Sequence, residues 1–202
     1  CTGQSFELLL ESTSTSASTN SNYTISWGDG TANYTGTTFP LTGIQHTYLS
    51  QGYFSLISTV TGTNGCVASQ TFNVYNGGNP AVGLGNPGST TNLCLPTSLT
   101  FPITGTSNNP PGTIYIISSN TGQPAVTFNH PPPASYTHTF TTTSCGASGA
   151  NNPNSFFIRV RAENPCGFSE STVEPITTST KPQANFSIAP DTIICTNTVA
   201  TF

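Results

Sequence analysis

One pattern of residues occurs twice along this chain and limits the folds open to it. In each copy a cysteine precedes alternating apolar residues, a His-Thr-aromatic triplet and an Asn-x-Cys turn. The matching pairs are Cys1 and Cys94, Phe6 and Leu99, His46 and His138, and Cys66 and Cys166. The offset is 94 − 1 = 93 residues at the first pair and 166 − 66 = 100 residues at the last. A repeat of this length predicts two domains of about 100 residues each rather than one large domain.

Glycine and proline in residues 76–80 mark a boundary between the copies, which we expect to be flexible. The predicted domains are residues 1–76, without a first strand, and residues 79–179. A third copy is expected to open in residues 181–202, so the chain reads as a window from a longer tandem array. The alternative is strand exchange, in which residues 184–188 complete the first domain of another copy.

The residue types of both copies favour strands and turns. Only 5% of residues are charged, whereas about 25% is usual. Threonine, serine and asparagine supply the polarity, and the apolar residues do not follow helical spacing. The sequence therefore predicts an all-β fold of tandem sandwich domains.

Charge and hydropathy argue against two classes of partner. The net charge is −4 and only three residues are Lys or Arg, so we do not expect binding to nucleic acid. No apolar run approaches the roughly 18 residues of a membrane span, so we do not expect membrane insertion. Six cysteines among so few charges favour an extracellular, cell-surface or secreted setting.

A short strand that ends in Gly28-Asp29-Gly30 is the most informative turn of the first copy. Glycine and aspartate tolerate the positive φ of a tight turn, and Trp27 just before it is expected to be buried at the centre of the domain. Asp29 is the single acid at this turn, whereas calcium takes six to eight oxygen ligands. We therefore predict a structural turn and no metal site.

The order Trp-Gly-Asp-Gly-Thr, His-Thr-Tyr, Gly-Tyr-Phe and Asn-Gly resembles the polycystic-kidney-disease (PKD) domain over Cys1 to about Tyr75. That family is an immunoglobulin-like β-sandwich, and the chain departs from it where Ile25-Ser26-Trp27 stands in place of the usual Asp-Phe. Residues 143–146, 164–167 and 182–186 resemble the giant PKD-repeat adhesins and filaments of gliding bacteria with type IX secretion.

The resemblance implies a structural repeat segment of an extracellular filament or surface adhesin. Neighbouring repeats or other copies of the chain would be its partners, through strand-edge contacts, and a surface polysaccharide is a further candidate. We expect neither an active site nor a cofactor. The alternative is a carbohydrate-binding or spacer region of a secreted multidomain hydrolase, which an exposed row of aromatic rings would favour.

The remaining polar residues predict structural roles. His46, His130 and His138 lack metal-ligand spacing and are expected to make structural hydrogen bonds. The acids Glu163, Glu170 and Glu174 are expected on a solvated strand and its hairpin. Arg159 and Arg161 alternate with apolar residues, so they face either solvent or the carboxylates of a neighbour. Asp191-Thr192-Ile193 resembles an O-glycosylation signal of gliding-type bacteria, which makes Thr192 a candidate site.

The strand order of an immunoglobulin-like sandwich predicts which cysteines can pair. Cys1 and Cys94 precede the second strand of each copy, while Cys66 and Cys166 follow the sixth strand at the opposite end, about 26 Å away. Disulfides need Cα atoms within about 7 Å. We therefore predict a Cys94–Cys145 bond within a domain and a Cys1–Cys166 bond across the junction. Partners of Cys66 and Cys195 would lie outside the chain.

Overall fold

The structure is a computed structural model that describes residues 6–8, 19–37, 44–185 and 187. Strands, turns and bends dominate these ranges, and no α-helix occurs within them, which confirms the predicted all-β fold. No helix in the described part of the chain is long and apolar enough to cross a membrane.

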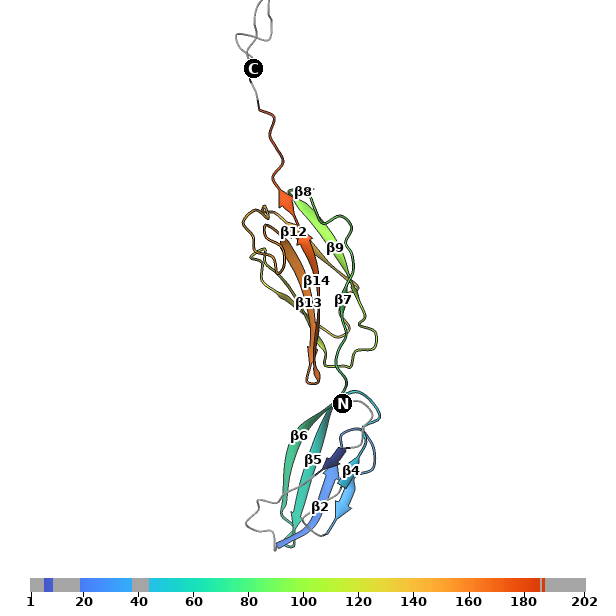
Figure 1. The fold of residues 1–202 in the computed structure, drawn as a ribbon. Helices are drawn as coiled ribbons and strands as arrows, with labels where there is room; N and C mark the ends of the chain where they lie inside the picture. The colour runs from blue at the N-terminus through green and yellow to red at the C-terminus, as the bar shows by residue number, and fades with distance from the viewer. Residues whose placement is uncertain (1–5, 9–18, 38–43, 186, 188–202) are drawn as a thin grey trace, which may run out of the picture.

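The N-terminal unit contains strands β1 to β6 (Figure 1). Its main sheet has the order β3-β2-β5-β6, and β1 pairs with β4 in a second, smaller sheet. All pairs are antiparallel. The strands are β1 (Phe6–Leu8), β2 (Asn20–Ser26), β3 (Tyr34–Gly36), β4 (Ile44–His46), β5 (Gly52–Gly62) and β6 (Val67–Asn76).

The C-terminal unit contains strands β7 to β15. It also has a four-stranded sheet, and its second sheet has three strands where that of the N-terminal unit has two. A four-stranded sheet of order β11-β10-β13-β14 faces a three-stranded sheet of order β12-β9-β7, as in an immunoglobulin-like sandwich. The short strands β8 and β15 pair in parallel. The strands are β7 (Gly83–Leu84), β8 (Leu93–Cys94), β9 (Thr97–Thr104), β10 (Ile114–Ser119), β11 (Val126–Asn129), β12 (Ser135–Phe140), β13 (Phe156–Asn164), β14 (Gly167–Ile176) and β15 (Thr178–Ser179).

The repeat in the sequence corresponds to a repeat in strand register. Phe6 of β1 lies opposite His46 of β4, and Leu99 of β9 lies opposite His138 of β12. These are the residues that the sequence pattern matched between the copies. The two four-stranded sheets also have equivalent strand orders, with β2 and β5 in the places of β10 and β13.

Each unit has its own hydrophobic core, and no residue belongs to both clusters. Alternation along β9 buries Leu99, Phe101 and Ile103, because successive side chains of a strand point to opposite faces. In the N-terminal unit Trp27 is only 4% exposed, which confirms its predicted burial. The buried residues of the N-terminal core are Tyr23, Ile25, Trp27, Ile44, Tyr48 and Leu56.

The two units lie end to end in Figure 1, with the β13–β14 hairpin pointing toward the N-terminal unit. The linker that the sequence predicts to be flexible is held by contacts. Gly77 and Gly78 each accept a hydrogen bond from this hairpin through their carbonyl oxygens. A long loop of residues 141–155 connects β12 and β13.

Candidate functional site

The turn after β2 depends on two glycines with positive φ. Gly28 has φ of 80° and Gly30 has φ of 81°, a region that only glycine adopts without strain. A Cβ at Gly28 would lie 2.5 Å from the carbonyl oxygen of Ser55, whereas a Cβ at Gly30 would meet nothing within 4 Å. Gly28 is therefore required both for its backbone angle and for the close approach of β5.

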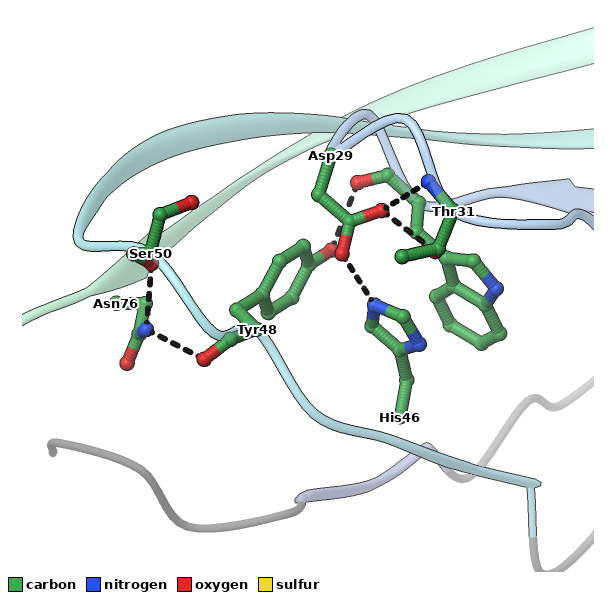
Figure 2. A network of polar contacts seen from close by, with 7 residues as sticks. Asp29, Thr31, His46, Tyr48, Ser50 and Asn76 are labelled. Atoms are coloured by element: carbon green, nitrogen blue, oxygen red, sulfur yellow. Dashed lines mark hydrogen bonds and ion pairs between the residues drawn. The ribbon is translucent and has the colours of Figure 1, made fainter.

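Asp29 is held at the tip of this turn by three hydrogen bonds (Figure 2). Its carboxylate accepts from the Thr31 amide at 3.1 Å, from the Thr31 hydroxyl at 2.7 Å and from His46 Nε2 at 2.8 Å. The Asp29 side chain is 6% exposed and that of His46 is 12% exposed. Burial alone would raise the pKa of the Asp29 carboxyl, but the bonds from Thr31 and His46 outweigh it and lower that pKa.

Aromatic rings fix the position of His46. Its ring stacks on Trp27 at a centroid distance of 4.2 Å and an interplanar angle of 2°, and meets the edge of Tyr48 at 4.8 Å. The Tyr48 hydroxyl donates to the carbonyl oxygen of Trp27 at 2.9 Å. Asn76 at the end of β6 donates to the carbonyl oxygens of Tyr48 and Ser50 (Figure 2). The network ties the turn to β4 and β6, which is the structural role that the sequence predicts for it.

The equivalent place in the C-terminal unit has lost the carboxylate. Thr121 Oγ1 lies 3.3 Å from His138 Nε2, where Asp29 faces His46 in the first copy. The Tyr136 hydroxyl lies 3.2 Å from His138 Nδ1, and the Phe140 ring is 4.6 Å away. His138 is 2% exposed, and desolvation lowers its pKa because burial disfavours the charged ring.

The described residues do not bring three His, Cys, Asp or Glu side chains together at a metal-binding distance. Glu174 differs from its predicted solvated role, because its carboxylate accepts from the amides of Asn151 and Asn152 and from the Ser155 hydroxyl. Burial opposes this effect, but the amide bonds lower the Glu174 pKa. Glu174 thus anchors the long loop before β13.

The junction between the units combines backbone and ring contacts. Cys166 Sγ donates to the Gly77 carbonyl oxygen at 3.3 Å, and Asn164 Nδ2 donates to the Gly78 carbonyl oxygen at 3.0 Å. Gly112 has φ of 85°, and a Cβ there would lie 2.5 Å from the ring of Tyr53. The Tyr53 and Tyr75 rings are 4.8 Å apart. Side chains from β5, β6 and the β13–β14 hairpin therefore meet at the linker.

An open groove of about 480 Å³ lies beside this junction, and no pattern in the sequence predicts it. Its exposed rings are Tyr53, 58% exposed, and Phe168, 57% exposed. Because Tyr53 comes from one unit and Phe168 from the other, no local pattern could have placed them in one groove. The lining residues are Tyr53, Gly112, Ile114, Arg161, Glu163, Asn164, Pro165, Cys166, Gly167 and Phe168.

Arg161 forms the polar centre of the groove. Its Nε donates to Glu163 at 2.7 Å and its Nη1 to Glu170 at 3.2 Å, while the guanidinium carbon lies 3.9 Å from the centre of the Phe168 ring. The sequence left open whether Arg161 faces solvent or a neighbour's carboxylates. Its carboxylate partners are in its own sheet. Arg159 donates to the Thr172 hydroxyl instead.

The four described cysteines are free thiols, so the predicted Cys94–Cys145 bond is not formed in the structure. Cys94 pairs with Ser179 of β15, and Ser144, next to Cys145, donates to Thr178 of the same strand. The two cysteines therefore share an end of the unit, as predicted, but β15 lies between their chain segments. Cys1, Cys195 and Thr192 lie outside the described residues, so the Cys1–Cys166 bond stays a prediction.

Comparisons with known proteins yield remote structural likeness only. No protein-family model matches the chain, and no curated protein matches it. Fibronectin(III)-like modules of Clostridium thermocellum CbhA align with a TM-score of 0.40 and 14% identity, over 92% of this chain and 93% of theirs. The FN1-FN3 domains of chicken CNTN1 align with a TM-score of 0.33 and 15% identity, over 89% of this chain and 63% of theirs.

Proposed function

We infer that the chain is a structural repeat segment of an extracellular filament or surface adhesin, from a gliding or type IX-secreting bacterium. In this proposal the two units are separate domains, residues 1–76 and 79–179, and residues 181–202 open a third repeat. The contact of Cys166 and Asn164 with the linker carbonyls is the observation that carries the proposal. A repeat that transmits force needs its neighbour in a defined orientation, and these bonds restrict the linker.

The exposed faces of the sheets are suited to association through uncharged polar groups. Hydroxyl pairs bridge neighbouring strands on these faces, and each pair adds a modest stabilisation of about 0.2–1 kcal/mol. The pairs are Ser98 with Thr139, Thr100 with Thr137 and Thr59 with Ser69, with oxygen separations of 2.8, 2.9 and 2.9 Å. We propose neighbouring repeats or other copies as the partners, met through such faces and through strand edges.

Immunogold electron microscopy of the producing bacterium tests this function. Antibodies against the 202-residue chain should label extended structures outside the cell. Label that co-localises with a secreted hydrolase in isolated particles would support the alternative, a carbohydrate-binding or spacer region of an enzyme. Label confined to the cell interior would contradict both.

A further inference from the structure

We propose that the groove at the junction of the two units binds an uncharged oligosaccharide. This goes beyond the structural role, because it assigns a ligand class to a site formed by residues of both units. The site comprises the two exposed rings, Tyr53 and Phe168, and the polar cluster of Arg161, Glu163 and Asn164.

The two rings provide apolar surfaces of the kind that sugar rings pack against. The face of an aromatic ring carries negative potential, which attracts the polarised C–H groups of a pyranose. Phe168 remains 57% exposed although the Arg161 guanidinium covers it at 3.9 Å. Tyr53 is 58% exposed and is held against Tyr75 at 4.8 Å. Both rings are therefore fixed before a ligand arrives, which reduces the entropy lost on binding.

The polar cluster provides donors and acceptors suited to hydroxyl groups. A guanidinium has five N–H donors. In Arg161, Nε donates to Glu163 and Nη1 donates to Glu170. Nη2 is left for a ligand hydroxyl, and the carboxylates have further lone pairs to accept from one. The Arg161 side chain is 37% exposed and that of Glu163 is 32% exposed, so a ligand can reach both.

The charge of the cluster selects against anionic polysaccharides. Among the described residues that line the groove, Arg161 is the one cation, and two carboxylates already neutralise it. A uronate or sulfate group would meet an excess of negative charge at this point and would be repelled. The fitting ligand is a neutral sugar chain.

The backbone around the groove argues against an extended peptide as the ligand. Peptides that add to a sheet bind through a row of free backbone groups at its edge. Here Ile114 pairs with Glu163, and Glu163 pairs with Phe168, so β10 and β13 lie inside the sheet, whereas β14, which carries Phe168, is its edge strand. A ligand in contact with Ile114 and Glu163 therefore meets their side chains and no free row of backbone groups.

Titration of the 202-residue chain with neutral hexasaccharides tests the proposal. Cellohexaose, chitohexaose and mannohexaose serve as probes, an alginate hexasaccharide is the anionic comparison, and binding is followed by NMR. At least one neutral probe should bind and should shift the amide signals of Phe168 and Tyr53. Phe168→Ala should weaken that binding by about tenfold or more, the usual effect of removing a central aromatic contact.

Phe72→Ala is the matched control, since Phe72 is an exposed phenylalanine, 43% exposed, outside the groove lining. It should leave the affinity unchanged. Binding equally weakened by Phe72→Ala, stronger binding of alginate, or no binding of any neutral probe overturns the proposal. None of these results bears on the label seen by electron microscopy, so the structural function is tested separately.

Discussion

At the scale of single residues, the two copies of one histidine position differ in what surrounds them. His46 contacts a carboxylate and stacks on Trp27, whereas His138 contacts two hydroxyl groups and is almost fully buried. The same strand position thus accepts a histidine in two different sets of contacts. In the first the imidazole pairs with an acid, and in the second desolvation lowers the pKa of the imidazole.

Replacement of Trp27 by alanine is expected to destabilise the N-terminal unit by about 3–5 kcal/mol, because it leaves a cavity and removes the surface on which His46 stacks. Chemical denaturation followed by circular dichroism measures the loss. Phe72→Ala, at a 43% exposed site, should cost much less. Equal losses would contradict a central role for Trp27.

His138 should make the C-terminal unit less stable in mild acid. Its folded pKa lies below the ordinary value of 6.5, so the unfolded state takes up the proton first. Its contribution is fully present above pH 6.5 and is lost as the pH falls from that value toward the folded pKa. Comparison of unfolding free energies of the native chain and of His138→Gln between about pH 7 and 5 isolates the effect. Parallel curves would contradict it.

At the scale of elements, turns and hairpins determine how strands of distant sequence meet. The Asn-x-Cys turns are equivalent, since Asn64 accepts from the Cys66 amide and Asn164 from the Cys166 amide. Their surroundings differ. The β13–β14 hairpin contacts the linker, whereas Cys66 lies beyond the far end of β5, about 33 Å along that strand from Gly52.

Gly112→Ala should change the relative orientation of the two units, because its new methyl group would overlap the Tyr53 ring. Gly122→Ala is a matched control, since Gly122 has the same φ of 85° but a Cβ there would meet no atom within 4 Å. Both should carry the left-handed backbone strain of about 1–2 kcal/mol. Residual dipolar couplings of the two units should change for Gly112→Ala alone; unchanged couplings would show that the ring does not set the orientation.

At the scale of the whole molecule, the four described cysteines lie at the ends of the units. Cys166 is at the junction, and Cys94 and Cys145 are both tied to β15 at the other end of the C-terminal unit. A covalent bond at either place would connect segments distant in sequence without entering a core.

Non-reducing peptide mapping of the native protein should find Cys94 and Cys145 as free thiols and Cys1 joined to Cys166. The Cys1–Cys166 bond follows from the strand order, and the Cys166 thiol is half-buried at the junction. Reduction of the Cys1–Cys166 bond should lower the stability by about 2–4 kcal/mol. Recovery of a Cys1–Cys66 peptide would contradict the pairing and the strand order together.

Local residue patterns were enough to predict the strands, the Gly28-Asp29-Gly30 turn and the burial of Trp27. Alternation of apolar residues and the φ preference of glycine are properties of short segments, and they act before tertiary contacts form. The match of Phe6 with Leu99 and of His46 with His138 followed for the same reason. The four free thiols and the role of Glu174 did not follow, because each depends on how a loop packs.

The junction groove was decided only by the tertiary structure. Tyr53 and Gly112 are 112 − 53 = 59 residues apart, and their contact depends on the angle at which one unit meets the other. The glycine and proline of the linker predict a flexible segment, yet side chains of a distant hairpin bind its carbonyl groups. A linker's composition describes the conformations open to it, whereas contacts from outside the segment select among them.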